Sequence, residues 1–212
     1  MDHLKFKMVI FDFDGTLGNS FLWFRSSINK AAKKYKFKEI NQTEIEKLRA
    51  LTTQEIMNYL GVSWWKVPFI ARYMRSLMTE DLEKITLFEG VPYLMNKFSE
   101  EGIYIVVLSS NSFQNVVRIL GPEVAIKINE IECGVSIFGK KNRFKKMIKK
   151  FGLSAKDVIA IGDETRDIEA ARVAGIHSGA VTWGYATSEA LEAESPDYIF
   201  HNMNDIIQKI LY

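Results

Sequence analysis

Between residue 90 and the end of the chain, short apolar runs alternate with helical patterns, and this alternation constrains the fold most strongly. The run 103–108 is continuously apolar, which suits a parallel strand buried on both faces. Further strands are predicted at 131–137, 158–161, 179–183 and 198–200, with helical segments between them. Such alternation predicts an α/β fold built on a doubly wound parallel sheet.

The residues between the first strand and position 87 follow a different pattern. Apolar residues recur at three- and four-residue steps over 21–35, which predicts an amphipathic helix preceded by Asn19 and Ser20 as caps. Thr43 and Glu46 predict a capping box for a second helix. Another box at Thr52 and Glu55 predicts a third helix, and a fourth helical pattern follows. This stretch is therefore predicted to form a small, all-helical module.

Composition narrows the classes of function. The 212 residues carry a net charge of +2, too small to indicate nucleic acid or an acidic membrane as partner. Cys133 is the only cysteine, which excludes an internal disulfide and a tetrahedral thiolate metal site. The N-terminal residues show no signal-peptide pattern, and no apolar run is long enough to cross a bilayer. We therefore expect a cytoplasmic enzyme or binding protein, with its oligomeric state left open.

Two carboxylates, Asp12 and Asp14, follow the apolar strand that begins near Met8. They point to the same side if the strand continues, and Gly15 lets the chain turn just beyond them. Carboxylates held this close repel each other unless a cation lies between them. A hard, oxygen-binding ion such as Mg²⁺ would relieve the repulsion. The simpler alternative is a buried strand that ends in an ordinary Asp-Gly turn.

Polar residues follow the other predicted strands in the same way. Ser109, Ser110 and Asn111 follow the run 103–108, and Asp163 and Asp167 follow the run 158–161. Ligands of open parallel sheets bind outside the carboxyl ends of the strands, so these side chains are expected to meet there. Read singly, Ser109 and Asp163 could be turn residues and Asp167 a helix-start acid.

Asp12-Phe13-Asp14-Gly15-Thr16-Leu17, Ser109, Lys140 and Gly162-Asp163-x-x-x-Asp167 occur in an order that resembles the haloacid dehalogenase-like hydrolases. The phosphoglycolate phosphatase-like branch is the most similar. The resemblance implies a Rossmann-like core of residues 1–18 and 87–212 and an inserted helical cap of residues 19–86. Two departures stand out: Lys141 lies where the branch commonly has proline, and Asn19 where it often has an acid.

The resemblance also implies roles for the acidic residues. Asp12 would attack phosphorus and form an aspartyl-phosphate. Asp14 would protonate the leaving alcohol, then activate the water that hydrolyses the intermediate. The implied Mg²⁺ ligands are Asp12, Asp14 (through its backbone carbonyl), Asp163 and Asp167. Asp167 would act through water or hold the lysine.

The remaining implied roles concern phosphate. Ser109, with the neighbouring Ser110 and Asn111, would bind the phosphate oxygens, and Lys140 would offset the charge that develops on them. Lys140 follows Phe138-Gly139 and precedes Phe144 by about one helical turn, as in related sequences. Lys141 stays open as an alternative, because most basic residues over 140–150 are expected to form a solvated helix face.

These inferences together predict a Mg²⁺-dependent phosphomonoesterase that acts on a small phosphorylated metabolite. The alternatives are a phosphomutase of the same family and a non-catalytic binding protein that retains the fold. Trp23 and Arg25 could face the cleft beneath the cap. The segment 183–185 follows a predicted strand and could border the cleft, but packing in the core is the favoured expectation.

Overall fold

The computed structural model describes residues 5–136 and 139–212. Its strands are β1 (Met8–Phe11), β2 (Gly18–Asn19), β3 (Thr86–Leu87), β4 (Tyr104–Leu108), β5 (Glu130–Glu132), β6 (Val158–Gly162), β7 (His177–Val181) and β8 (Tyr198–Phe200). Its α-helices are α1 (Phe21–Tyr35), α2 (Ile45–Arg49), α3 (Thr53–Leu60), α4 (Val67–Glu80), α5 (Val91–Glu100), α6 (Phe113–Ala125), α7 (Lys140–Phe151), α8 (Thr165–Ala174), α9 (Ser188–Ala193) and α10 (Met203–Leu211).

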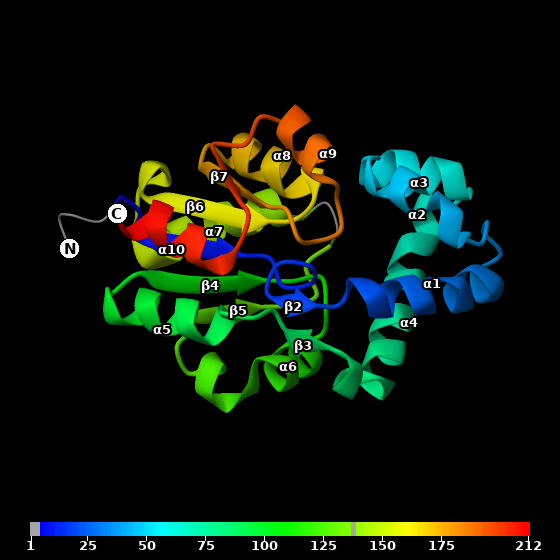
Figure 1. The fold of residues 1–212 in the computed structure, drawn as a ribbon, viewed down its shortest axis with the longest axis horizontal. Helices are drawn as coiled ribbons and strands as arrows, with labels where there is room; N and C mark the ends of the chain where they lie inside the picture. Colours follow the sequence, from blue (N-terminus) through cyan, green and yellow to red (C-terminus); the bar gives the residue numbers. More distant parts are fainter. Residues whose placement is uncertain (1–4, 137–138) are drawn as a thin grey trace.

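Six strands form one parallel sheet in the order β5-β4-β1-β6-β7-β8. Side chains alternate between its two faces. Val9 and Phe11 of β1 pack with α5, α6 and α10, whereas Met8 and Ile10 pack with α7 and α8. Figure 1 shows α5 and α6 on one side of the sheet and α8 on the other. The predicted α/β fold with a doubly wound parallel sheet is therefore confirmed.

Helices α1 to α4 lie beyond the arrowheads of β4 and β6, at the carboxyl ends of the strands (Figure 1). Trp23 and Ile28 of α1 and Met74 and Leu77 of α4 share a separate apolar cluster. The chain enters and leaves this group of helices through β2 and β3, which pair antiparallel with Gly18 opposite Leu87. The helices therefore lie over the sheet edge at which the polar residues were predicted to gather.

Capping contacts decide where the helices in this group begin. The predicted box at Thr52 and Glu55 is confirmed: the Thr52 hydroxyl accepts from the Glu55 N–H, and Glu55 accepts from the Thr52 N–H. The box predicted at Thr43 is wrong, because the structure forms it two residues earlier, at Asn41, with Glu44 as partner.

Two other local predictions need correction. Ser20 stands at the start of α1, but its hydroxyl contacts the Tyr185 hydroxyl at 3.1 Å instead of capping the helix. Strand β5 ends at Glu132, before the predicted end of that strand. Ile137 and Phe138, which entered the predictions of that strand and of Lys140, lie outside the described residues.

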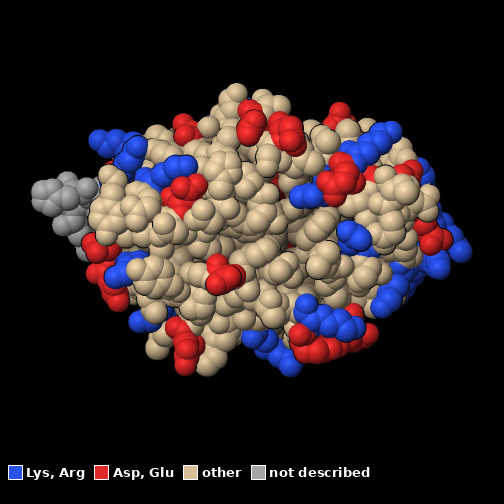
Figure 2. All heavy atoms as spheres, viewed as in Figure 1, with Lys and Arg blue, Asp and Glu red and all other residues tan. Residues whose placement is uncertain are grey.

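Charged side chains of both signs share the face of the molecule drawn in Figure 2. Lys and Arg side chains are interspersed there with Asp and Glu, in keeping with the net charge of +2. Within the described ranges, no helix is both apolar enough and long enough to cross a bilayer.

The packing of Phe98 on α5 provides a test of the core. Phe98 is fully buried and stacks on Phe11 with ring centroids 6.3 Å apart. Because truncation leaves a cavity beneath β1, Phe98→Ala is expected to lower the free energy of unfolding by about 3–5 kcal/mol in urea denaturation. Tyr93→Ala on the exposed face of the same helix is the control, with an expected change within about 0.5 kcal/mol. Equal effects of the two substitutions would contradict this packing.

Candidate active site

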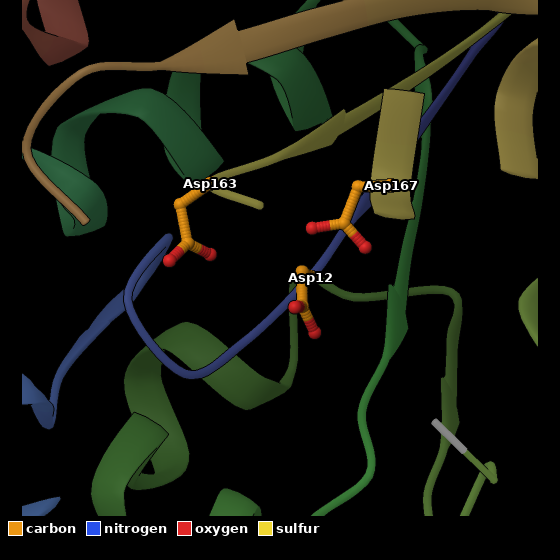
Figure 3. Close-up of side chains that lie close together, drawn as sticks. All are labelled: Asp12, Asp163 and Asp167. Carbon is orange, nitrogen blue, oxygen red and sulfur yellow. The ribbon is translucent and has the colours of Figure 1, made fainter. Parts of the chain in front are cut away.

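Three aspartates meet at the carboxyl ends of β1 and β6. Asp12 directly follows β1, Asp163 directly follows β6, and Asp167 lies in the first turn of α8. One oxygen from each carboxylate lies within 4.8 Å of the others, and all three side chains are buried. Figure 3 shows the three carboxylates around a common space. The parallel pairing fixes this arrangement, because the Asp12 N–H donates to the Ile161 carbonyl at 2.9 Å.

Lys140 joins two of these aspartates. Its Nζ lies 2.8 Å from Asp12 Oδ2 and 2.6 Å from Asp167 Oδ1, and the residue is 5% exposed. Burial opposes the charged form of the lysine, but the facing carboxylates outweigh burial and raise the pKa of Lys140. They act in return on Asp167: burial would raise its pKa, yet Lys140 and Arg166 hold it below the usual value. Lys141, the alternative, is exposed.

Asp163 has a different environment. Its Oδ1 accepts from the Thr16 hydroxyl at 2.7 Å and its Oδ2 from the Tyr185 N–H at 2.8 Å, so its hydrogen-bond donors among the described residues are uncharged. Burial raises the pKa of Asp163 well above its usual value. In the described part of the chain, the cluster thus holds three carboxylates, two of which contact the single ammonium of Lys140, a formal excess of two negative charges.

This donor set fits a hard divalent cation. All three groups offer carboxylate oxygens, which Mg²⁺ prefers, and a divalent ion would balance the excess charge. The three oxygens, all within 4.8 Å of one another, are close enough for one such ion to lie among them.

Glycines surround the carboxylates at close range. A Cβ on Gly184 would lie 2.2 Å from Asp163 Cβ, and one on Gly162 would lie 2.3 Å from Asp167 Oδ2. Gly15 has φ +80° and faces Asp163 Oδ2, so it is constrained by both conformation and space. The acidic side chains are therefore enclosed by backbone that leaves no room for a larger residue.

Asp14 lies beside this cluster and is not part of it. Asn111 Nδ2 donates to Asp14 Oδ2 at 3.1 Å, joining the segment after β1 to the segment after β4. Burial, followed by the negative charge of Asp12, raises the pKa of Asp14 to about 6.

The segment after β4 is held by its own hydrogen bonds. The buried Ser109 hydroxyl accepts from the Asn111 N–H at 3.0 Å. The Ser110 carbonyl accepts from Arg75 of α4 at 2.9 Å, and the Asn111 side chain contacts Met78 of the same helix. All three residues predicted to bind phosphate therefore lie at the sheet edge beneath α4.

Sequence reasoning missed Arg49 and ranked core packing above a position at the cleft for residues 183–185. Trp183 packs against the core as predicted, but Tyr185 does not: its N–H binds Asp163 and its ring contacts Phe21 and Phe24 of α1. Arg49 of α2 donates to the carbonyls of Gly184 and Tyr185 at 3.1 and 3.0 Å. Their position in the chain could have indicated a place at the site for residues 182–186. These residues follow β7, which is the neighbour of β6 in the sheet.

Comparison with known proteins gives the same assignment as the geometry. The sequence model of one protein family, the haloacid dehalogenase-like hydrolases, matches residues 9–181 of this chain. The matched range includes every predicted site residue. The chain belongs to this family. The match, together with the phosphatase relatives below, confirms the prediction of a phosphatase of this family.

Curated relatives and solved structures extend this result. A phosphoglycolate phosphatase from Synechococcus elongatus is 29% identical over 203 residues, covering 95% of this chain and 96% of that protein. One from Pasteurella multocida is 24% identical and covers 96% of this chain and 97% of that protein. The structure of a predicted phosphatase from Clostridium acetobutylicum shares the fold, with a TM-score of 0.80 at 20% identity and coverage of 97% and 98%.

The position of Lys140 leads to a stability test. Lys140→Met removes the ammonium between two buried carboxylates, which is expected to lower the free energy of unfolding by about 3–5 kcal/mol without added divalent cation. Lys141→Met, at the exposed neighbouring position, is expected to change it by less than about 0.5 kcal/mol. Chemical denaturation of both variants gives the comparison. A greater loss from the Lys141 substitution would contradict the geometry.

Proposed function

We propose that this chain is a Mg²⁺-dependent phosphomonoesterase that hydrolyses a small phosphorylated metabolite through an aspartyl-phosphate on Asp12. The observation that carries the proposal is the buried group of Asp12, Asp163 and Asp167 around Lys140. Burying this many charges costs stability even when they are paired, so a functional use accounts for their presence better than a purely structural one. A nucleophilic carboxylate beside a fixed cation suits phosphoryl transfer, which depends mainly on positioning and charge stabilisation.

Asp12 and Lys140 carry the central step. A carboxylate oxygen of Asp12 attacks phosphorus, the bond from phosphorus to the ester oxygen breaks, and the phosphoryl group becomes bound to Asp12. Lys140, already 2.8 Å from Asp12, offsets the charge on the phosphoryl oxygens. Ser109, together with Ser110 and Asn111, binds those oxygens from the end of β4.

Asp14 handles the protons. It donates a proton to the departing alcohol oxygen and then takes one from the water that attacks the aspartyl-phosphate. Its hydrogen bond from Asn111 holds the carboxylate in place at the sheet edge. This role needs a group close to Asp12 but separate from the cluster of three aspartates.

The metal would be held by Asp12, Asp163, Asp167 and the backbone carbonyl of Asp14. When bound, Mg²⁺ supplies positive charge that stabilises the phosphoryl oxygens during transfer. The uncharged donors to Asp163, from Thr16 and Tyr185, support the assignment because they fix this carboxylate without neutralising it.

Residues 19–86 are proposed to act as a cap over the core formed by 1–18 and 87–212. Opening of the cap would admit substrate, and closure would exclude bulk water from the aspartyl-phosphate. The paired strands β2 and β3 carry both crossings between the two parts, so they are the natural place for such a movement. The cytoplasmic location stays a prediction from the sequence.

Two alternatives make different predictions. A phosphomutase would use the same aspartates but isomerise a phosphorylated substrate without releasing phosphate. A non-catalytic binding protein would be expected to have lost Asp12, Asp14 or Asp163, and all three are present. Phosphate release from a panel of phosphorylated metabolites that includes phosphoglycolate, the substrate named for the curated relatives, separates these alternatives.

Replacement of the nucleophile tests the proposal directly. Asp12→Asn is expected to lower phosphate release by roughly a thousandfold or more, because the amide cannot attack phosphorus. Circular dichroism of the variant is expected to match that of the original chain. Glu89→Gln is the matched control, as it makes the same type of change at an exposed position. Substantial turnover by Asp12→Asn would remove Asp12 as the nucleophile.

Removal of divalent cations tests the metal role. Excess chelator is expected to reduce phosphate release to background, and added Mg²⁺ is expected to restore it, because the cluster needs a cation to balance its charge. Steady-state assays before and after readdition provide the measurement. Full activity in excess chelator would rule out the metal role.

A further inference from the structure

A cavity of about 330 Å³ extends from the candidate active site into the group formed by α1 to α4. Asp14, Asn111 and Arg166 line it at the sheet edge, where the phosphate chemistry is proposed. The volume is large beside the roughly 30 Å³ that one water occupies in the liquid. It falls in the range of pockets that bind small organic ligands, roughly 300–1,000 Å³.

Away from the sheet edge the lining is predominantly apolar. Each of the four helices contributes to it, with Ile28 from α1, Leu48 from α2, Ile56 and Leu60 from α3, and Ile70 from α4. Ile28, Leu48 and Leu60 are already almost fully buried without a ligand. Such a surface gains free energy by enclosing apolar groups and provides few partners for polar ones.

We propose that this cavity binds the organic part of the substrate and that the substrate class is phosphate monoesters of apolar alcohols. The inference rests on the proposed phosphomonoesterase function and specifies its substrate. The phosphate lies at Asp12 and Lys140, and the apolar substituent extends past Asp14 and Asn111 into the space between the helices. This occupant follows from the shape of the cavity, which runs without a break from the proposed site of phosphoryl transfer to the apolar lining between the helices.

A carboxylated substituent such as that of phosphoglycolate is less suited to this cavity. A buried carboxylate needs a cation or several hydrogen bonds. Of the arginines that line the cavity, Arg49 and Arg75 donate to backbone carbonyls and Arg166 pairs with Glu164. Arg25 and Arg75 pair with no carboxylate among the described residues, so they are the cations that a carboxylated substituent would have to use.

A series of unbranched alkyl phosphates tests the substrate class. With Mg²⁺ present, kcat/KM is expected to rise roughly two- to fourfold for each methylene from ethyl to hexyl phosphate, because each added group leaves water for an apolar lining. Hexyl phosphate is expected to be a better substrate than phosphoglycolate. A flat or falling series would overturn the inference. So would a preference for phosphoglycolate over hexyl phosphate.

A matched pair of variants locates the effect in the cavity. Ile56→Trp fills part of the space and is expected to lower the kcat/KM ratio of hexyl to ethyl phosphate at least tenfold. Gln54→Trp introduces the same ring on the same helix at an exposed position and is expected to leave the ratio unchanged. Equal ratios in the two variants would place the apolar preference elsewhere and overturn the assignment.

Failure of this inference can be distinguished from failure of the proposed function. Release of phosphate from ethyl phosphate or phosphoglycolate without a chain-length trend keeps the phosphatase and removes the apolar substrate class. Absence of phosphate release from every ester contradicts both. Hexylphosphonate, which has no ester bond to hydrolyse, is expected to bind more tightly than ethylphosphonate in calorimetry, and equal affinities would again overturn the inference.

Discussion

The buried contact of Lys140 with Asp12 and Asp167 is the interaction on which the rest of the structure depends. Taking three charged groups out of water costs several kcal/mol for each ion, and an apolar cluster would stabilise the fold at least as well. The sheet nevertheless directs these groups into one enclosed space, and places Asp163 there without a cation. This arrangement stores a local excess of negative charge, which is of use to a protein that binds a metal and a phosphate.

Topology brings these charges together. Strand β1 lies between β4 and β6, so the segments that follow all three strands emerge side by side at one edge. Asp12 is tied to β6 through the Ile161 carbonyl, and Asn111 ties the segment after β4 to Asp14. The site therefore forms as a consequence of strand pairing, and it needs no long loop to carry its residues into position.

These features explain which parts were predictable. The central strands are continuous apolar runs, so their ends, and with them Asp12, Ser109 and Asp163, could be located from residue order alone. Lys140 could be ranked above Lys141 only by likeness to related sequences. In the structure, α7 begins at Lys140, which places that side chain at the sheet edge and leaves its neighbour exposed.

The parts that failed depend on details that residue order does not give. Asn41 and Thr43 are both recognised cap residues with a glutamate three positions later, and the structure uses Asn41 with Glu44. Tyr185 is an aromatic residue of a type common in protein cores. Its backbone N–H donates to Asp163 only because the turn after β7 folds over that carboxylate. The cavity is likewise invisible in the sequence, because its lining uses the same apolar periodicity that also fills a closed helical core.

The segment 184–186 connects the proposed metal site with the helices that line the cavity. On one side the Tyr185 N–H holds Asp163 at the proposed metal site, and on the other Arg49 of α2 binds the carbonyls of Gly184 and Tyr185. Tyr185 also lines the cavity. A displacement of α2 must therefore break hydrogen bonds to the same few residues that orient Asp163. In the proposed reaction, a substrate enclosed by the helices and the orientation of Asp163 would thus both favour the position of α2 seen here, which would link recognition of the organic group to the chemistry at phosphorus.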